Sequence, residues 1–126
     1  MRKIHLDTNF LIELHVIGSK SRSILKSLLK EKVELSISAI TWHEFLCGPL
    51  DSEYQENILN LVEKRIVAVS ADVAELGAIL FNASGRKKGS KADCLIAATS
   101  IYSHAELLTW NLSDFKNFQQ FGLLLV

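Results

Sequence analysis

Short apolar runs recur along the chain, and each has the length of a β-strand. The clearest is residues 33–37, where Val33, Leu35 and Ile37 alternate with Glu34 and Ser36. This is the two-residue period of a strand with one buried face. Residues 66–69 are mostly β-branched and apolar, which is typical of a buried strand. The pattern predicts strands at residues 4–6, 33–37, 66–69, 106–109 and 122–126.

Between these strands, apolar residues recur at three- and four-residue spacing, which indicates amphipathic helices. Phe10, Leu11 and Leu14 begin one such repeat. Asp72 is predicted to cap another helix, because aspartate is a preferred helix N-cap. The expected helices cover residues 10–17, 21–30, 38–47, 53–64, 72–81 and 92–102.

Strands that alternate with helices pair in parallel through right-handed crossovers. We therefore expect an α/β fold, a three-layer α/β/α sandwich with a mainly parallel central sheet. The length of 126 residues suits one domain, residues 1–126, and 48% hydrophobic with 22% charged residues is typical of globular chains. Cys47 and Cys94 are too few for a disulfide framework, and no apolar stretch is long enough to span a bilayer. We expect a soluble, cytoplasmic protein.

Three acidic residues follow expected strands, at the edge where parallel sheets carry their chemistry, and a fourth can join them if its loop folds over the same edge. Asp7 follows the first strand, and Glu44 lies in the helix after the second. Asp93 begins the helix before the 106–109 strand, and Asp114 follows that strand. Carboxylates gathered at one edge repel one another unless they hold hard divalent cations such as Mg²⁺ or Mn²⁺. Taken singly, each acid is also explained as a helix cap or a solvated side chain.

Four segments carry a family resemblance, in the right order and over the whole chain. They read IHLDTN at residues 4–9, TWHEFLCG at 41–48, KADCLIAAT at 91–99 and LTWNLSDF at 108–115. Together they resemble the successive motifs of the PIN-domain ribonucleases, and most closely the VapC-type toxins of toxin–antitoxin pairs.

The resemblance implies a metal-dependent endoribonuclease that hydrolyses RNA phosphodiester bonds and blocks translation by cutting tRNA or other structured RNA. It makes four acids both catalytic residues and ligands of one or two Mg²⁺ or Mn²⁺ ions: Asp7, Glu44, Asp93 and Asp114. It also implies a cognate antitoxin and a homodimer.

The resemblance further assigns supporting roles near the acids. Thr8 would order metal-bound water, and Thr109 with Asn111 would support the pocket. Trp110 stands where many relatives carry a basic residue.

A basic loop precedes Asp93, and it is a candidate contact for the RNA phosphate backbone. Its spacing and residue order differ from a phosphate-binding P-loop, and no strand precedes it. The candidate RNA-binding residues are Arg86, Lys87, Lys88 and Lys91.

Other chemistries fit less well. The segment from His43 to Cys47 is similar to a zinc-protease helix with cysteine as its second ligand, but no third ligand is apparent. Haloacid dehalogenase-like phosphatases have a second aspartate where this chain has Asn9, and a receiver domain needs an acidic neighbour for Asp7. The alternative readings are a non-catalytic RNA- or protein-binding module, or a phosphatase- or receiver-like domain.

The formal net charge of zero argues at first against a nucleic-acid partner. If four of the 14 acidic residues bind cations, however, ten remain against 14 basic residues. The rest of the molecule is then modestly basic, with much of its positive charge in residues 20–32 and 86–91. This distribution suits a phosphodiester substrate.

Overall fold

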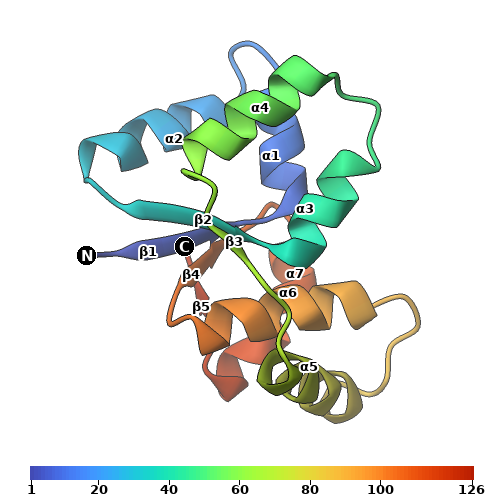
Figure 1. Ribbon diagram of the computed structural model, residues 1–126. Coiled ribbons are helices and arrows are strands. Elements are labelled where there is room, and N and C mark those ends of the chain that lie inside the picture. The colour runs from blue at the N-terminus through green and yellow to red at the C-terminus, as the bar shows by residue number, and fades with distance from the viewer.

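The computed structural model describes residues 1–126 and is built on a five-stranded sheet in which every neighbouring pair is parallel (Figure 1). The strand order is β3-β2-β1-β4-β5. The chain runs outward through β2 and β3 and then returns to place β4 on the other side of β1, so the order reverses beside β1. The strands are β1 (Lys3–Leu6), β2 (Glu34–Ser38), β3 (Ile66–Val67), β4 (Glu106–Leu108) and β5 (Leu124–Leu125).

Helices cover both faces of the sheet, which confirms the predicted three-layer sandwich (Figure 1). On one face lie α1 (Thr8–Leu14), α2 (Lys20–Lys30) and α4 (Ser52–Leu61). On the other lie α5 (Ala71–Ala83), α6 (Lys91–Tyr102) and α7 (Leu112–Phe115), followed by a 3-10 helix over Lys116–Phe121. The helix after β2, α3 (Ala39–Leu46), contributes to the packing of both layers.

The side chains of β1 show why the sheet separates two cores. Ile4 and Leu6 pack into the cluster beneath α1, α2 and α4. His5, between them, points to the opposite face, where its Nδ1 lies 3.2 Å from the Ser100 hydroxyl of α6. Burial and the nearby charge of Lys3 lower the pKa of His5 to about 4, so the ring is neutral at neutral pH.

Serine and aspartate side chains fix most helix starts. Ser19, Ser38, Asp51 and Ser70 each accept a hydrogen bond from a backbone N–H of the first turn. The prediction that Asp72 caps α5 was wrong, because Ser70 holds that position. Asp72 instead accepts a hydrogen bond from the Tyr102 hydroxyl at 2.9 Å.

Several predicted helices and strands were too long. The first helix ends at Leu14 rather than at residue 17, and β3 and β5 are only two residues each. The short α7 and the 3-10 helix after it were not predicted. Their apolar side chains, Phe115 and Phe118, are buried in the core beneath α5 and α6. No helix is long and apolar enough to cross a membrane.

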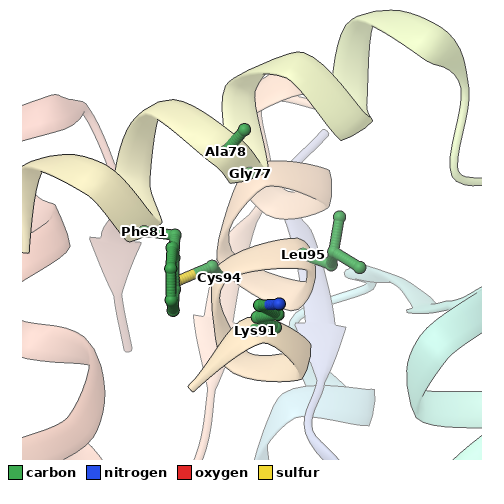
Figure 2. Close-up of a pocket in the computed structure, with 6 residues that line it drawn as sticks. All are labelled: Gly77, Ala78, Phe81, Lys91, Cys94 and Leu95. Carbon is green, nitrogen blue, oxygen red and sulfur yellow. The ribbon is translucent and has the colours of Figure 1, made fainter. Parts of the chain in front are cut away.

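Helices α5 and α6 approach closely at Gly77. A Cβ at this position would lie 2.8 Å from Leu95 Cδ2 and 3.7 Å from Leu95 Cα. Beside this contact is a largely apolar pocket of about 200 Å³, in which Phe81 and Cys94 lie together with Leu95 across from them (Figure 2). This contact holds α6, which carries Asp93, against α5.

Replacing Gly77 with valine should therefore weaken this packing. We expect Gly77→Val to destabilise the protein by about 2 kcal/mol, the usual cost of overpacking, and to lower Tm by about 8 °C. Ala78→Val is the matched control, because Ala78 is exposed and the new side chain is the same. Thermal unfolding of both variants tests this, and equal losses would contradict the role given to Gly77.

Candidate functional site

The four predicted acids gather near one edge of the sheet, at the carboxyl ends of β1, β2 and β4. Asp7 directly follows β1, and Glu44 lies on α3, which follows β2. Asp93 is in the first turn of α6, and Asp114 is on α7, which follows β4. Because the strand order reverses between β1 and β4, this edge is where a parallel sheet leaves room for a ligand.

Asp7 is the most firmly held of the four, with only 4% of its surface exposed. Its Oδ2 accepts a hydrogen bond from the Thr109 hydroxyl at 2.7 Å, and its Oδ1 accepts one from the Thr8 backbone N–H at 2.8 Å. The Asn111 backbone N–H donates to Thr109 Oγ1 at 3.0 Å, and Asn9 Nδ2 lies 3.5 Å from the same oxygen. Asp7 is thus both the N-cap of α1 and a site residue.

Thr8 joins two of the acids. Its backbone N–H contacts Asp7, and its hydroxyl donates to Glu44 Oε1 at 2.7 Å. This hydrogen bond ties α3 to the start of α1 and orients the Glu44 carboxylate.

Electrostatic repulsion links all four acids. The pKa of Asp93 is raised to about 6, first by burial and then by the charges of Asp7, Asp114 and Glu44, while Lys87 partly opposes the rise. The pKa of Asp7 is also raised, mainly because it is buried, and Glu44 and Asp114 add to the effect. Asp7, Glu44 and Asp114 are therefore near enough to Asp93 for their charges to disfavour its ionisation.

The four acidic side chains do not surround a single ion-binding position. No three His, Cys, Asp or Glu side chains lie close enough together to hold one ion. Asp93 and Asp114 line a small polar cleft of about 70 Å³ together with Lys87. Lys87 Nζ lies 3.6 Å from Asp114 Oδ1, and this is the only ion pair in the site.

The donor chemistry nevertheless fits a hard divalent cation. All four groups offer carboxylate oxygens, the ligands that Mg²⁺ and Mn²⁺ prefer. Asp7, Glu44 and Asp93 have no basic partner within ion-pair distance. Lys87 supplies the only positive charge of the chain beside this group of carboxylates, so further positive charge would stabilise it.

The side chains of the four predicted basic residues do not all face the acidic residues. Lys87 faces the acidic cleft through Asp114. Arg86 and Lys91 lie over the Phe81 ring, at 5.2 and 5.5 Å from its centroid. Lys88 is exposed and lines a neighbouring pocket with Arg86 and Lys91.

Three contacts of Trp110 near the site were not predicted. Asn9 Oδ1 accepts a hydrogen bond from the Trp110 backbone N–H at 3.1 Å, and so holds the segment after β4. The Trp110 indole N–H donates to the buried Ser21 hydroxyl at 2.8 Å, and its ring stacks on Phe10 with centroids 6.2 Å apart. The motif containing Asn9 was visible in the sequence, but nothing in the sequence pairs Trp110 with Ser21.

Neutralising Asp93 should stabilise the metal-free protein. A raised folded-state pKa means that the charged form is disfavoured by folding, so this cost is present above pH 6 and disappears as pH falls toward 4. We expect Asp93→Asn to gain about 1 kcal/mol at pH 7.5, after allowing for screening by water and a weaker helix-dipole interaction. Tm should rise by about 4 °C.

Thermal unfolding of this variant and the unaltered protein between pH 4 and 8, with EDTA present, measures the effect. The difference in Tm should shrink below pH 6. A large loss of stability at pH 7.5 would instead show that Asp93 serves mainly to start α6.

Comparison with known proteins places this geometry in a family. A family model described as PIN domain matches residues 4–119. A chain in the structure of FitAB bound to an IR36 DNA fragment is 24% identical, with a TM-score of 0.74 over 98% of this chain and 93% of that chain. A chain of a toxin–antitoxin complex from Klebsiella pneumoniae is 28% identical, with a TM-score of 0.68 over 89% of each chain.

A more distant structure has the same fold. It is VapC20 from Mycobacterium tuberculosis, described as a sarcin-ricin loop cleaving toxin, with 16% identity and a TM-score of 0.66 over 98% of each chain. Comparison with curated proteins gives no significant match. Because the family model spans residues 4–119 of the 126, the protein belongs to the PIN-domain family.

Proposed function

We propose that the protein is a metal-dependent endoribonuclease and the toxin of a VapC-type toxin–antitoxin pair. The observation that carries this proposal is the gathering of four carboxylates, three of them without a basic partner, at the ligand-binding edge of the sheet, where their charges raise the pKa of Asp93 and Asp7. Membership of the PIN-domain family supports it, because PIN domains are generally nucleases.

The residues have distinct roles in this proposal. Asp7, Glu44, Asp93 and Asp114 would hold one or two Mg²⁺ or Mn²⁺ ions. When bound, a divalent cation supplies positive charge that stabilises the developing charge on phosphodiester oxygens and favours deprotonation of a water. The chain itself keeps the ligands oriented: Thr109 fixes the Asp7 carboxylate by its hydrogen bond.

Two of the other three acids also have a side-chain partner. Thr8 donates to Glu44, and the loop that precedes α6 carries Lys87 to Asp114. With a cation on Asp114, Lys87 would be available to contact a phosphate of the substrate. Lys87 therefore belongs to the RNA-binding residues of this proposal, together with the exposed Lys88.

RNA is the proposed substrate class, and tRNA or another structured RNA is the proposed target. The similarity in fold to VapC20, whose described target is the sarcin-ricin loop, supports a structured RNA. The proposed partners are a cognate antitoxin and a second copy of the chain. The similarity to toxin chains solved as toxin–antitoxin complexes supports the antitoxin.

Removing the charge of Asp7 should abolish the activity. We expect Asp7→Asn to lower the rate of RNA cleavage in Mn²⁺ or Mg²⁺ by at least about 100-fold, because a buried ligand of the cation is lost. The fold should be retained, since asparagine caps a helix as well as aspartate does. Gel analysis of RNA cleavage, with and without EDTA, measures this.

Asp51→Asn is the matched control, because Asp51 is also an aspartate N-cap, accepting from the Tyr54 N–H, but lies outside the site. It should cleave normally. Added Mn²⁺ should also raise the Tm of the unaltered protein more than that of Asp7→Asn. Equal cleavage by Asp7→Asn would refute the site, and RNA binding without any cleavage by the unaltered protein would favour the non-catalytic RNA-binding module.

The basic loop before α6 should strengthen the binding of RNA rather than speed its cleavage. We expect Lys88→Gln to raise KM for RNA by about 3-fold with little change in kcat, and to reduce the slope of log affinity against log salt by about one. Lys26→Gln, which removes an exposed lysine from α2, is the control and should leave both values unchanged. Equal effects of the two substitutions would mean that the loop has no specific role.

A further inference from the structure

A second polar pocket lies at the amino-terminal end of the sheet, away from the four acids. Its volume is about 550 Å³. Its lining comes from the starts of β1 and β2, from β3 with the turn before it, and from the end of α6. Figure 1 shows where these elements lie. We call it the amino-edge pocket. The lining residues that matter here are Lys3, His5, Glu34, Lys64, Arg65 and His104.

The amino-edge pocket carries more positive than negative charge. Lys3 and Lys64 have no carboxylate within ion-pair distance. Lys3 is even the register partner of Glu34 across β1 and β2, yet the two side chains do not form an ion pair. Arg65 is already occupied, by Glu63 at 2.9 Å and by the Leu35 carbonyl at 2.8 Å. Two ammonium groups are thus available to a ligand.

The end of α6 does little to offset this charge. A helix carboxyl end normally presents unpaired carbonyl groups and a partial negative charge. Here the carbonyls of Thr99, Ser100 and Ile101 accept hydrogen bonds from the backbone N–H groups of Ser103, Ala105 and His104, in that order. The helix end is therefore closed by its own following turn.

The floor of the pocket holds an imidazole nitrogen that the protein leaves available. His5 is 2% exposed, and its Nδ1 is paired with the Ser100 hydroxyl. Its Nε2 has no hydrogen-bond partner in the protein. Every side-chain nitrogen or oxygen that is fully buried does have such a partner. Nε2 must therefore reach open space, and the pocket that His5 lines is the space it reaches.

We propose that the amino-edge pocket binds a phosphate group, with His5 Nε2 at its floor and the ammonium groups of Lys3 and Lys64 at its rim. When the Ser100 hydroxyl donates to Nδ1, Nε2 carries the proton and donates to a phosphate oxygen. The two lysines supply the opposite charge. A divalent cation does not fit this pocket, because the same lysines would repel it.

The volume of the pocket decides which phosphates to test. About 550 Å³ exceeds what inorganic phosphate needs and lies within the range of small-molecule sites. The phosphate can therefore come from the free anion or from a mononucleotide. None of the four acids of the candidate site lines this pocket, so the proposal does not depend on nuclease activity.

The test follows the His5 ring directly in the full-length protein. Histidine-selective ¹⁵N labelling and ¹H–¹⁵N spectra, with the His5 signals assigned by His5→Gln, are recorded during titration with inorganic phosphate at constant pH and ionic strength. We expect a saturable shift of the His5 signals. Lys64→Asn should weaken the apparent affinity at least 3-fold. Asparagine tolerates the left-handed backbone at this position (φ 60°), so the fold should be retained.

Lys26→Gln is the control for loss of one positive charge and should titrate like the unaltered protein. Adenosine monophosphate and adenosine are the second and third probes. Tighter binding of the monophosphate than of inorganic phosphate identifies a nucleotide as the source, and equal binding identifies the free anion; both agree with the proposal. No saturable shift, an equal loss in both lysine variants, or adenosine binding as well as its monophosphate would overturn it.

Discussion

The hydrogen bond between Asp7 and Thr109 is the contact on which the site depends. Asp7 ends β1 and starts α1, and its backbone N–H also donates to the Leu108 carbonyl at 3.0 Å. The same residue therefore continues the β1–β4 pairing, caps the first helix and presents a carboxylate where the strand order reverses. Because Asp7 is almost fully buried, its carboxylate keeps one orientation, and Thr8 extends that order to Glu44.

The fold holds the four acidic residues at one edge of the sheet although their charges repel one another. Burial and three neighbouring carboxylates disfavour the ionised form of Asp93, and only Lys87 opposes them. The fold tolerates this cost because it is set by elements that are stabilised elsewhere, including the close packing of α5 on α6 at Gly77. The overall charge of zero conceals this arrangement, since an acidic edge and a basic loop coexist in one chain. Positive charge from a cation would remove the repulsion.

The fold and the positions of the acids were predictable, because both follow from short-range pattern. Alternation and β-branched runs located the strands, and the rule for parallel sheets assigned Asp7, Glu44 and Asp114 to one edge. Asp93 could join them only if the loop before its helix folded over that edge, which the sequence did not settle. The hydrogen bonds that orient them depend on side-chain conformations that no pattern specifies. The choice of Ser70 over Asp72 as a cap, and the turn of Arg86 toward Phe81, depend in the same way on tertiary contacts.

The central claim is that the four carboxylates form one divalent-cation site. Anomalous scattering from crystals soaked in Mn²⁺ tests it most directly, because the ion is located without any assumption about activity. Such a site should give a strong peak within coordination distance of Asp7 and at least one of the other three acids, and the peak should be lost in Asp7→Asn. A peak at another place in the molecule, or none at saturating Mn²⁺, would contradict it.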